Sequence, residues 1–450
     1  MPSSSSSSSP SFAAPPLGSN ASCTSRAAVH AMEDKVYSKV TWRLISFLFV
    51  GYVFAFIDRT NVGFAKLGMQ DELGFSEAVF GLGAGIFFVS YFLLEVPSNV
   101  LMARFGARRW IARILITWGM LSMATLLVKT PMQFYTVRLL LGAAEAGFFP
   151  GVMLYLTQWY PAERRSRVIT LFMAAIPVGS VLGGIVSGWI LEHFGGNAHL
   201  SAWQWLFLLE GAPAVVLGVI AFFYLNDRIE DARWLSADEK ALLQSRIVVD
   251  QSHALTHKVG DAMRSPLVWL LAFINFAYLA GVTLMFWMPS MLRAAGVKST
   301  VHIGWMVAAP FAVAVIGMLV LGRTSDWLRE RRWHTVLPGL LSAAGVAALP
   351  WAAGDVTALV LVSVVAVAGN VIANALFWNL PTAVLSGAAA TVGIAFVNAF
   401  GQMAGFLGPT VFGKLFTATG SATTGLYLLS GVLCLGSLAV LLISKRLVNR

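Results

Sequence analysis

The sequence predicts an all-α membrane protein, with twelve transmembrane helices arranged as two pseudo-symmetric six-helix bundles. The first observation is composition, because 57% of the 450 residues are hydrophobic and only 12% are charged, whereas soluble domains carry about 25% charged residues. The second is an uncharged run from Val356 to Gly413, far longer than the ~20 apolar residues that one spanning helix needs. The third is that the second half of the chain repeats features of the first.

Hydropathy divides the chain into four parts. Residues 1–39 begin with a Ser- and Pro-rich stretch and are predicted to form a disordered cytoplasmic tail, in which Met32 offers an alternative start of translation. An N-terminal six-helix bundle covers 40–225, a polar cytoplasmic linker covers 226–265, and a C-terminal six-helix bundle covers 266–450. The expected spans lie near 42–62, 78–101, 110–128, 133–157, 168–191 and 203–225, and then near 266–290, 301–322, 335–353, 357–380, 390–412 and 423–444.

The distribution of basic residues predicts the orientation of the chain. With both termini cytoplasmic, the inner loops and tails hold 18 of the 31 Lys and Arg residues, the central linker holds 6, and the outer loops hold 5, Lys66 among them. This excess follows the positive-inside rule and predicts a multi-pass protein of the cell inner membrane. The same rule explains the net charge of +10 without a nucleic-acid partner.

Two internal repeats connect the halves. Arg-Arg-Trp at 108–110 returns at 331–333, an offset of 223 residues, and Gly179 and Gly183 correspond to Gly401 and Gly405 at an offset of 222. Duplicated halves with a site between them are typical of alternating-access carriers. Glycines four residues apart allow the close helix approach that a sliding interface needs, although ordinary tight packing would also use them.

Several motifs carry a family resemblance. They are Asp58-Arg59-Thr-Asn61-Val-Gly-Phe-Ala, Glu95-Val-Pro97-Ser-Asn99, Gly106-Ala-Arg108-Arg109-Trp110, Arg138-x-x-x-Gly142-x-x-Glu145-Ala-Gly147-Phe-x-Pro150-Gly151, Trp205-Leu-Phe-x-Leu-Glu210-Gly-x-Pro213, and Gly322-x-x-Ser-Asp326 followed by Arg331-Arg332. From Val40 onward the chain resembles the major facilitator superfamily, and within it the anion:cation symporter family. That family includes carriers of tartrate, galactonate, hydroxyphenylacetate and phthalate, and animal carriers of sialic acid and glutamate.

The resemblance implies proton-driven transport of carboxylates, and it implies gating at the inner loops. The loop residues expected to act in gating are Arg108, Arg109, Asp326, Arg331 and Arg332. Trp327 departs from the superfamily motif, which usually has a basic residue at that position.

Ionisable residues inside the expected spans are the candidate functional groups. A charge at mid-bilayer costs at least about 2.5–3.5 kcal/mol, so such residues line wet cavities or pair with one another. The six candidates lie in the first half of the chain: Asp58, Arg59, Glu95, Arg138, Glu145 and Glu210. We expect Glu95 to be a helix-end or gate residue and Glu210 to be structural.

The remaining four charges predict an anion and proton site. Arg138 and Glu145 are seven residues apart, so they share a helix face about 10 Å apart. We expect Asp58 to meet Arg138, leaving Arg59 free for a ligand and Glu145 without a close cation. Arg59 and Arg138 are the candidate carboxylate clamps, and Asp58 and Glu145 are the candidate proton carriers. The alternatives are that Arg138 snorkels to the surface and that Asp58 and Arg59 are a folding pair.

The resemblance also implies that neutral side chains complete the substrate site. These are Tyr91 in the second span, Trp378 in the tenth and Asn398 in the eleventh, with Tyr278 as a lesser candidate. Trp378 could instead anchor its helix at the lipid interface.

Taken together, the sequence predicts a secondary active transporter, not an enzyme, that couples the proton to symport of a small organic anion by alternating access. The class of substrate spans hydroxy acids, sugar acids and aromatic acids. We expect a monomer in the lipid bilayer, without a cofactor. We also expect no metal, because Cys23 and Cys434 lack metal-ligand spacing. The alternatives are efflux or exchange of an organic anion, Na⁺ as the coupling ion, a membrane sensor without net transport, and a membrane-embedded enzyme.

Overall fold

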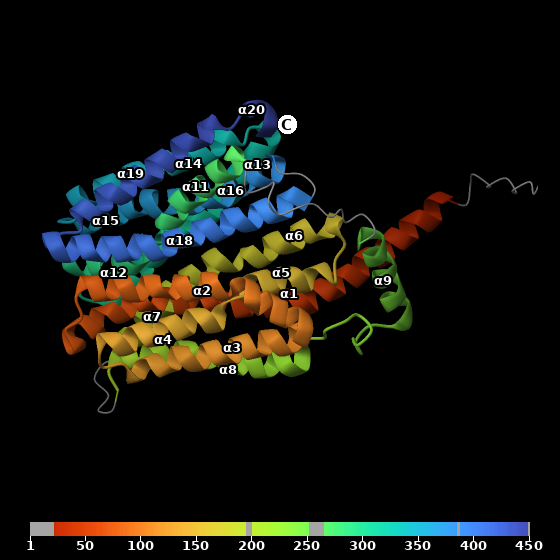
Figure 1. The fold of residues 1–450 in the computed structure, drawn as a ribbon, viewed down its shortest axis with the longest axis horizontal. Helices are drawn as coiled ribbons and strands as arrows, with labels where there is room; N and C mark the ends of the chain where they lie inside the picture. The colour runs from red at the N-terminus through yellow and green to blue at the C-terminus, as the bar shows by residue number, and fades with distance from the viewer. Residues whose placement is uncertain (1–21, 195–199, 252–264, 385–387, 449–450) are drawn as a thin grey trace, which may run out of the picture.

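The computed structural model describes residues 22–194, 200–251, 265–384 and 388–448, and this part of the chain is helical throughout, without strands (Figure 1). The predicted all-α fold is therefore confirmed. Eleven of its helical segments are long and apolar enough to cross a membrane. The remaining expected span, 390–412, is the eleventh in order and lies within α18, a 32-residue helix in which Lys414 is the only charged residue.

The first bundle contains six expected spans, two of which are each built from two helices in succession. The span 133–157 is divided between α4 and α5, and the span 168–191 runs from the second half of α6 into α7. The elements are α1 (Ser22–Leu73), α2 (Glu77–Phe105), α3 (Ala107–Ala124), η1 (Thr125–Leu127), α4 (Pro131–Glu145), α5 (Phe148–Thr157), α6 (Ala162–Met173), α7 (Ala175–His193) and α8 (Ala202–Tyr224).

The second bundle follows the linker helix α9 (Ala237–Gln251). Its tenth span contains a π-helical turn, η2, where the helical register shifts by one residue. The elements are α11 (Pro266–Ala280), α12 (Thr283–Ala294), α13 (Thr300–Leu328), α14 (Arg332–Ala352), α15 (Val356–Ser363), η2 (Val364–Ala368), α16 (Gly369–Phe377), α17 (Asn379–Val384), α18 (Ala388–Thr419), α19 (Thr423–Ala439), η3 (Val440–Leu442) and α20 (Lys445–Val448).

The predicted domain boundaries need two corrections. The first helix begins at Ser22, so residues 22–39 are helical and not a disordered tail; residues 1–21 lie outside the described part of the chain. The extension is held by side chains that sequence hydropathy does not weigh: Tyr37 stacks on Tyr160 at 5.8 Å, and Lys39 pairs with Glu239 of α9 at 2.9 Å. The second correction is that the linker is not plain loop, since α9 occupies much of it.

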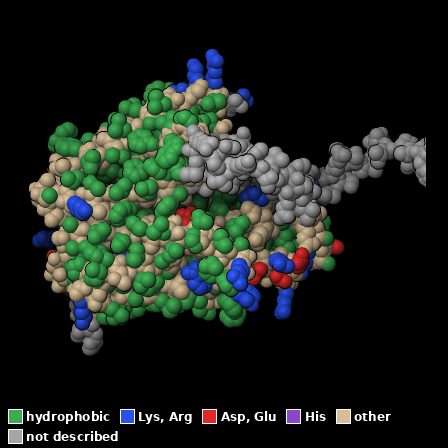
Figure 2. Space-filling model, in the orientation of Figure 1, with side chains coloured by type: hydrophobic (Ala, Val, Ile, Leu, Met, Phe, Trp, Pro, Cys, Tyr) green, Lys and Arg blue, Asp and Glu red, His purple; other side chains and the backbone are tan. Residues whose placement is uncertain are grey.

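The two ends of the bundles differ. We call the end that carries α9 and α20 the terminal face and the opposite end, with the turns at 74–76, 295–299 and 420–422, the distal face (Figure 1). Hydrophobic side chains cover most of the flank between these faces, and many of the visible charged ones gather near α9 at the terminal face (Figure 2). A wide apolar flank is the surface that a protein presents to lipid.

The two bundles close against each other at the distal face. Helix α2 packs on α18 and α7 packs on α13; a side chain added at Gly81 would meet the carbonyl oxygen of Pro409, and one at Gly188 would meet that of Thr300. Polar bonds reinforce the closure, because Trp287 of α12 donates to Glu77 of α2 at 2.6 Å.

Toward the terminal face the side chains of α2 and α13 become exposed. In α2 the residues from Phe80 to Phe88 are mostly buried, whereas Val96 is 70% exposed. In α13 the buried residues end at Ala314, apart from Ser325, and Ile316 and Leu319 are 64% and 60% exposed. The interface between the bundles is therefore tight at the distal half of these helices and open at the terminal half.

Candidate functional site

A buried ion pair joins the first and fourth spans. Arg59 of α1 donates from Nη2 to Oε1 of Glu145 at 2.5 Å, and their side chains are 18% and 2% exposed. Glu145 is the last residue of α4, and the chain then passes through Gly147 at φ 87° before α5 begins. A side chain at Gly147 would also collide with Ser98. The glycine therefore allows the break in the span that places Glu145 at a helix end, facing α1.

Aromatic rings surround the guanidinium of Arg59. Its centre lies 5.0 Å from the ring of Phe56, 5.7 Å from that of Phe87 and 5.4 Å from that of Tyr91. Ring faces attract cations in a desolvated site, so these contacts stabilise a charge that would otherwise be costly to bury. Tyr91, expected only from the family resemblance, is thus placed beside Arg59.

The ion pair leaves polar atoms unmatched. Nε of Arg59 and Oε2 of Glu145 are both buried, and neither has a hydrogen-bond partner in the part of the chain that the structure describes. A buried polar group without a partner costs free energy, so each partner of the pair retains the capacity to bind a further group.

Arg138 lies next to this pair but outside it. Its Nε donates to the carbonyl oxygen of Gly83 at 3.2 Å, and its guanidinium lies 4.9 Å from the ring of Phe87, the ring that Arg59 also contacts. Arg138 is 3% exposed, so it does not snorkel to the surface. Within the described residues no carboxylate forms an ion pair with it, although the charges of Asp58 and Glu145 both act on it.

Asp58 is held by neutral donors. The indole of Trp118 donates to Oδ2 at 3.0 Å, Asn61 donates to Oδ1 at 3.0 Å, and Ser122 donates to Oδ1 as well. Asp58 is 2% exposed, so these bonds replace the water that a carboxylate needs. Trp118 and Ser122 project from α3, and the side chain of Asp58 therefore points to the α3 side of α1.

The predicted pairing is therefore wrong in two respects. Asp58 bonds to α3 and not to Arg138, and Arg59 is not free, because it pairs with Glu145. The reason is that successive residues of α1 point about 100° apart, and packing directs Asp58 toward α3 and Arg59 toward α4. Sequence spacing alone contains no information about which neighbour each face meets.

The predicted residues of the second half lie apart from the charged group. Trp378 is half-buried at the junction of α16 and α17, with its ring 5.4 Å from that of Phe377. Asn398 is half-buried in α18. Among the described residues, no hydrogen bond or ring contact connects either side chain to Arg59, Arg138 or Glu145. Tyr278 is fully buried in α11.

Two of the predicted gating residues, Arg108 and Arg332, form hydrogen bonds with groups of their own half of the chain. The backbone N–H of Arg108 donates to Asp227 at 2.7 Å, and Arg332 donates to the carbonyl oxygen of Leu441 at 2.7 Å, each within its own half of the chain. Arg109 and Asp326 are exposed. The carbonyl oxygen of Arg331 accepts from the hydroxyl of Thr335, one turn into α14.

A second ionic cluster at the distal face was missed by the sequence analysis. Lys66, which hydropathy placed in an outer loop, is 1% exposed inside α1. It pairs with Glu77 at 2.6 Å and lies 4.8 Å from the ring of Trp287, across the bundle interface. The available signal was that Lys66 and Glu77 flank one short turn with opposite charges. In the described residues no group of His, Cys, Asp and Glu could hold a metal ion.

These observations define a class of protein. Two membrane-spanning helical bundles that close at one face and open at the other, with buried ionic residues along α1 and α4, have the construction of an alternating-access transporter.

The chain belongs to the Major Facilitator Superfamily, whose family model matches residues 48–409. It is 45% identical over 418 residues to "Putative metabolite transport protein NicT" of Pseudomonas putida, covering 92% of this chain and 96% of the relative. It is 43% identical over 417 residues to "Putative tartrate transporter" of Agrobacterium vitis, with the same two shares covered. The predicted resemblance to this superfamily and to bacterial organic-anion-type carriers is confirmed, and so is transport as the activity in place of catalysis.

Solved structures agree on the fold. A bacterial homologue of the human lysosomal transporter Spinster, in an inward-facing and occupied conformation, matches with a TM-score of 0.72 at 17% identity, covering 89% of this chain and 96% of that one. The xylose transporter XylE from E. coli, in a partially occluded inward-open conformation, matches with a TM-score of 0.71 at 14% identity, covering 90% and 97%. The protein is a multi-pass membrane transporter of a small molecule.

Proposed function

We propose that this transporter is a proton-coupled symporter of a small organic anion, with a carboxylate as the recognised group. The observation that carries the proposal is the ion pair of Arg59 and Glu145 beside Arg138, which has no ionic partner of its own among the described residues. In this mechanism the proton is the coupling ion, and the protein needs no cofactor.

The arginines supply anion recognition. A guanidinium donates two parallel hydrogen bonds to a carboxylate and keeps its charge in a buried site. Arg138 is available for this contact because only its Nε is engaged, by a backbone carbonyl. Tyr91 beside Arg59 offers an aromatic wall, and Trp378 and Asn398 of the opposite bundle would complete the site when the bundles close.

Coupling to the proton arises from competition for Arg59. A substrate carboxylate that binds Arg59 displaces Glu145, whose carboxylate is then buried without a cation. Such a group binds a proton to avoid an uncompensated charge. Anion and proton therefore favour each other's binding, as linkage requires. Asp58, the other predicted proton carrier, is the candidate for a second proton.

The orientation follows from the basic residues. The terminal face carries the Arg- and Lys-rich loops, so we place it and both termini in the cytoplasm of an inner-membrane protein. The conformation described here, closed at the distal face, is then inward-facing. A monomer contains both bundles and both gates, and we propose the monomer as the transporting unit.

The names of relatives support an anion as substrate but leave a second function open. Two relatives from Agrobacterium vitis are named tartrate transporters, whereas a relative from Acinetobacter baumannii, 38% identical over 419 residues, is named a quinolone resistance transporter. The second candidate is therefore efflux of an organic anion through the same site.

Proteoliposomes containing a trapped pH-sensitive dye test the proposal. Tartrate, other hydroxy acids, sugar acids and aromatic acids are added outside one at a time, with the membrane potential clamped. We expect the true substrate to acidify the interior, and Na⁺ to have no effect. Uptake of labelled substrate without internal acidification would contradict proton symport. Accumulation of substrate that occurs only when the imposed pH gradient is reversed would favour efflux.

A further inference from the structure

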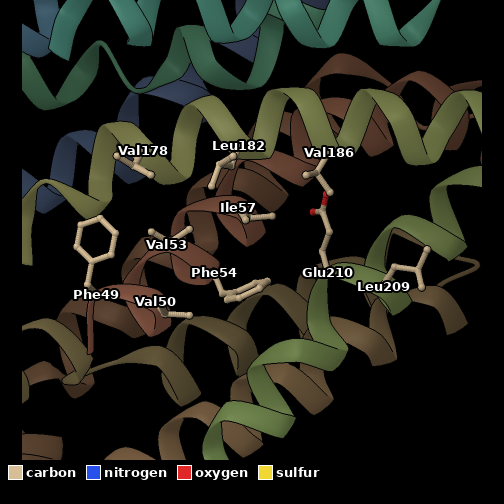
Figure 3. Close-up of a pocket in the computed structure, with 10 residues that line it drawn as sticks. All are labelled: Phe49, Val50, Val53, Phe54, Ile57, Val178, Leu182, Val186, Leu209 and Glu210. Carbon is tan, nitrogen blue, oxygen red and sulfur yellow. The ribbon is translucent and has the colours of Figure 1, made fainter. Parts of the chain in front are cut away.

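Glu210 is a buried carboxyl that the transport mechanism above does not use. It lies on α8, 3% exposed, and its Oε1 accepts a hydrogen bond from Ser187 of α7 at 2.7 Å. Its Oε2 is buried without a partner, and no ion pair reaches it within the described residues. Figure 3 shows it beside a lateral cavity of about 370 Å³ between α1, α7 and α8, whose nine other lining residues are all apolar. An ionised carboxylate in such a place is strongly disfavoured.

The neighbours of Glu210 provide no compensating cation. From α1, Asn61 lies within hydrogen-bonding reach, and Asp58 behind it adds a second negative charge. From α7 the contact is the hydroxyl of Ser187. From α3, which packs on α8, Gly119 and Met123 face the adjacent Gly211, and neither can titrate.

Asn61 lies between the two carboxyls, and its own side-chain oxygen lacks a hydrogen-bond donor among the described residues. Its Nδ2 donates to Asp58 at 3.0 Å, so its Oδ1 must find a donor elsewhere. Within the described residues neither that oxygen nor Oε2 of Glu210 has a hydrogen-bond partner, and both are buried. Each of the two side chains therefore has an acceptor oxygen that lacks a donor. A proton on Oε2 of Glu210, donated to Oδ1 of Asn61, satisfies both atoms at once.

Asp58 does not need that proton. Three donors, from Asn61, Trp118 and Ser122, converge on its two oxygens, which is the environment that favours a carboxylate. Among the described residues Glu210 accepts a hydrogen bond from one donor, the hydroxyl of Ser187. Of the two carboxyls, Glu210 is therefore the one that holds a proton.

We propose that Glu210 is a proton-binding site, occupied at neutral pH, whose O–H donates to Asn61 and so fixes the Asn61 amide as a donor to Asp58. The amide can also turn over, accepting from a protonated Asp58 and donating to an ionised Glu210. In that exchange the proton leaves Oε2 of Glu210 and one is bound at Asp58, so the pair holds one proton in either arrangement. The resting proton does not depend on the proposed symport, whereas its exchange with Asp58 rests on it.

Infrared difference spectroscopy of the purified full-length protein in lipid tests the resting proton. At neutral pH a protonated carboxyl gives a C=O band above the amide region, which shifts on exchange into D₂O. We expect Glu210→Gln to remove this band, and Asp58→Asn and Glu145→Gln, as matched controls, to keep it. A band that persists in Glu210→Gln would overturn the proposal.

Thermal unfolding supplies a second, independent outcome. The amide of Glu210→Gln donates to Asn61 and accepts from Ser187 as the protonated acid does, so we expect Tm within about 1 °C of wild type. Glu210→Ala leaves both partners unsatisfied, and we expect Tm to fall by about 2 °C or more. If Glu210→Gln destabilises as much as Glu210→Ala, the carboxyl is not neutral at rest and the proposal fails.

The two proposals fail separately. Loss of the band in Glu210→Gln, together with uptake that never acidifies the liposomes, would leave the proton site standing and refute symport. Internal acidification in wild type, together with an unchanged band in Glu210→Gln, would do the reverse.

Discussion

The two bundles have matching architectures and different buried chemistry. Both bundles have glycines at equivalent positions of their fifth spans, on α7 and α18, and both contribute to the closed distal face. Yet among the buried polar residues of the described chain, the charged ones are all in the first half: Glu33, Asp58, Lys66, Arg138, Glu145 and Glu210. Those of the second half are neutral: Asn275, Thr283, Thr300, Ser325, Thr335, Ser342, Ser363, Asn370, Thr410 and Ser437.

This difference indicates a division of labour. A buried charge persists only where it has partners, and the first bundle supplies them as an ion pair, aromatic faces and three donors on one carboxylate. The second bundle can move as a neutral body against this charged one, without separating any ion pair at the centre. Polar links that do cross the interface, such as Trp287 to Glu77 and Thr300 to Glu192, lie at the distal face, where opening must occur.

Arg138→Lys should have the largest effect, because it keeps the charge and removes the planar fork. Charge-assisted hydrogen bonds contribute about 1.5–3 kcal/mol each, so we expect transport to fall roughly 10- to 100-fold or more. Trp378→Phe in the neutral bundle is the matched comparison and should cost only a few-fold. Counterflow of the acid that most strongly acidifies the liposomes measures both, and equal losses in the two variants would contradict the division between the bundles.

Glu145→Gln should separate coupling from binding. The amide cannot carry the proton that Glu145 is proposed to take, so accumulation driven by an imposed pH gradient should be lost while counterflow persists. Glu239→Gln, an acid of α9 outside the site, is the control and should accumulate substrate normally. Gradient-driven accumulation that survives in Glu145→Gln would exclude Glu145 as a proton carrier.

The sequence predicts the architecture more reliably than the pairing of residues. Runs of apolar residues and basic loops depend on the bilayer alone, so the spans and the two halves follow from composition. The family resemblance supplied Tyr91, whose ring lies beside Arg59. The ion pair of Arg59 with Glu145 and the donors to Asp58 were not predicted, since they depend on how α1 crosses α3 and α4, which is set by packing across the whole bundle.

Some missed residues did leave a trace. Trp118 and Ser122 are one helical turn apart in the third span, which is the spacing of two donors on a single helix face. Asn61 stood inside a motif already singled out for Asp58 and Arg59. The burial of Lys66 could not be anticipated, because its partner Trp287 is more than two hundred residues away and belongs to the other bundle.

Gly81→Ala tests whether distal closure governs the cycle. The added methyl group would meet the backbone of Pro409 where α2 crosses α18, so the closed distal face is penalised. Overpacking costs about 1–3 kcal/mol, and we expect roughly tenfold slower transport with the population shifted toward distal opening. Spin labels on the distal ends of α2 and α18 measure the shift by their separation. Gly431→Ala, where the added group meets nothing within 4 Å, should leave both the separation and the rate unchanged.

Lys39→Ala should have the smallest effect, because its ion pair with Glu239 is exposed to solvent. The Lys39 side chain is 45% exposed, and surface pairs contribute about 0–1 kcal/mol. The hydrogen bond from Lys39 lowers the pKa of Glu239, so the pair stabilises the fold at neutral pH and this contribution disappears as pH falls through that lowered pKa. We expect wild type and Lys39→Ala to differ in Tm by about 1 °C or less at neutral pH and to converge in acid, with transport unchanged. A loss of transport comparable to that of Arg138→Lys would mean that charge at the terminal face, and not burial in the first bundle, controls the activity.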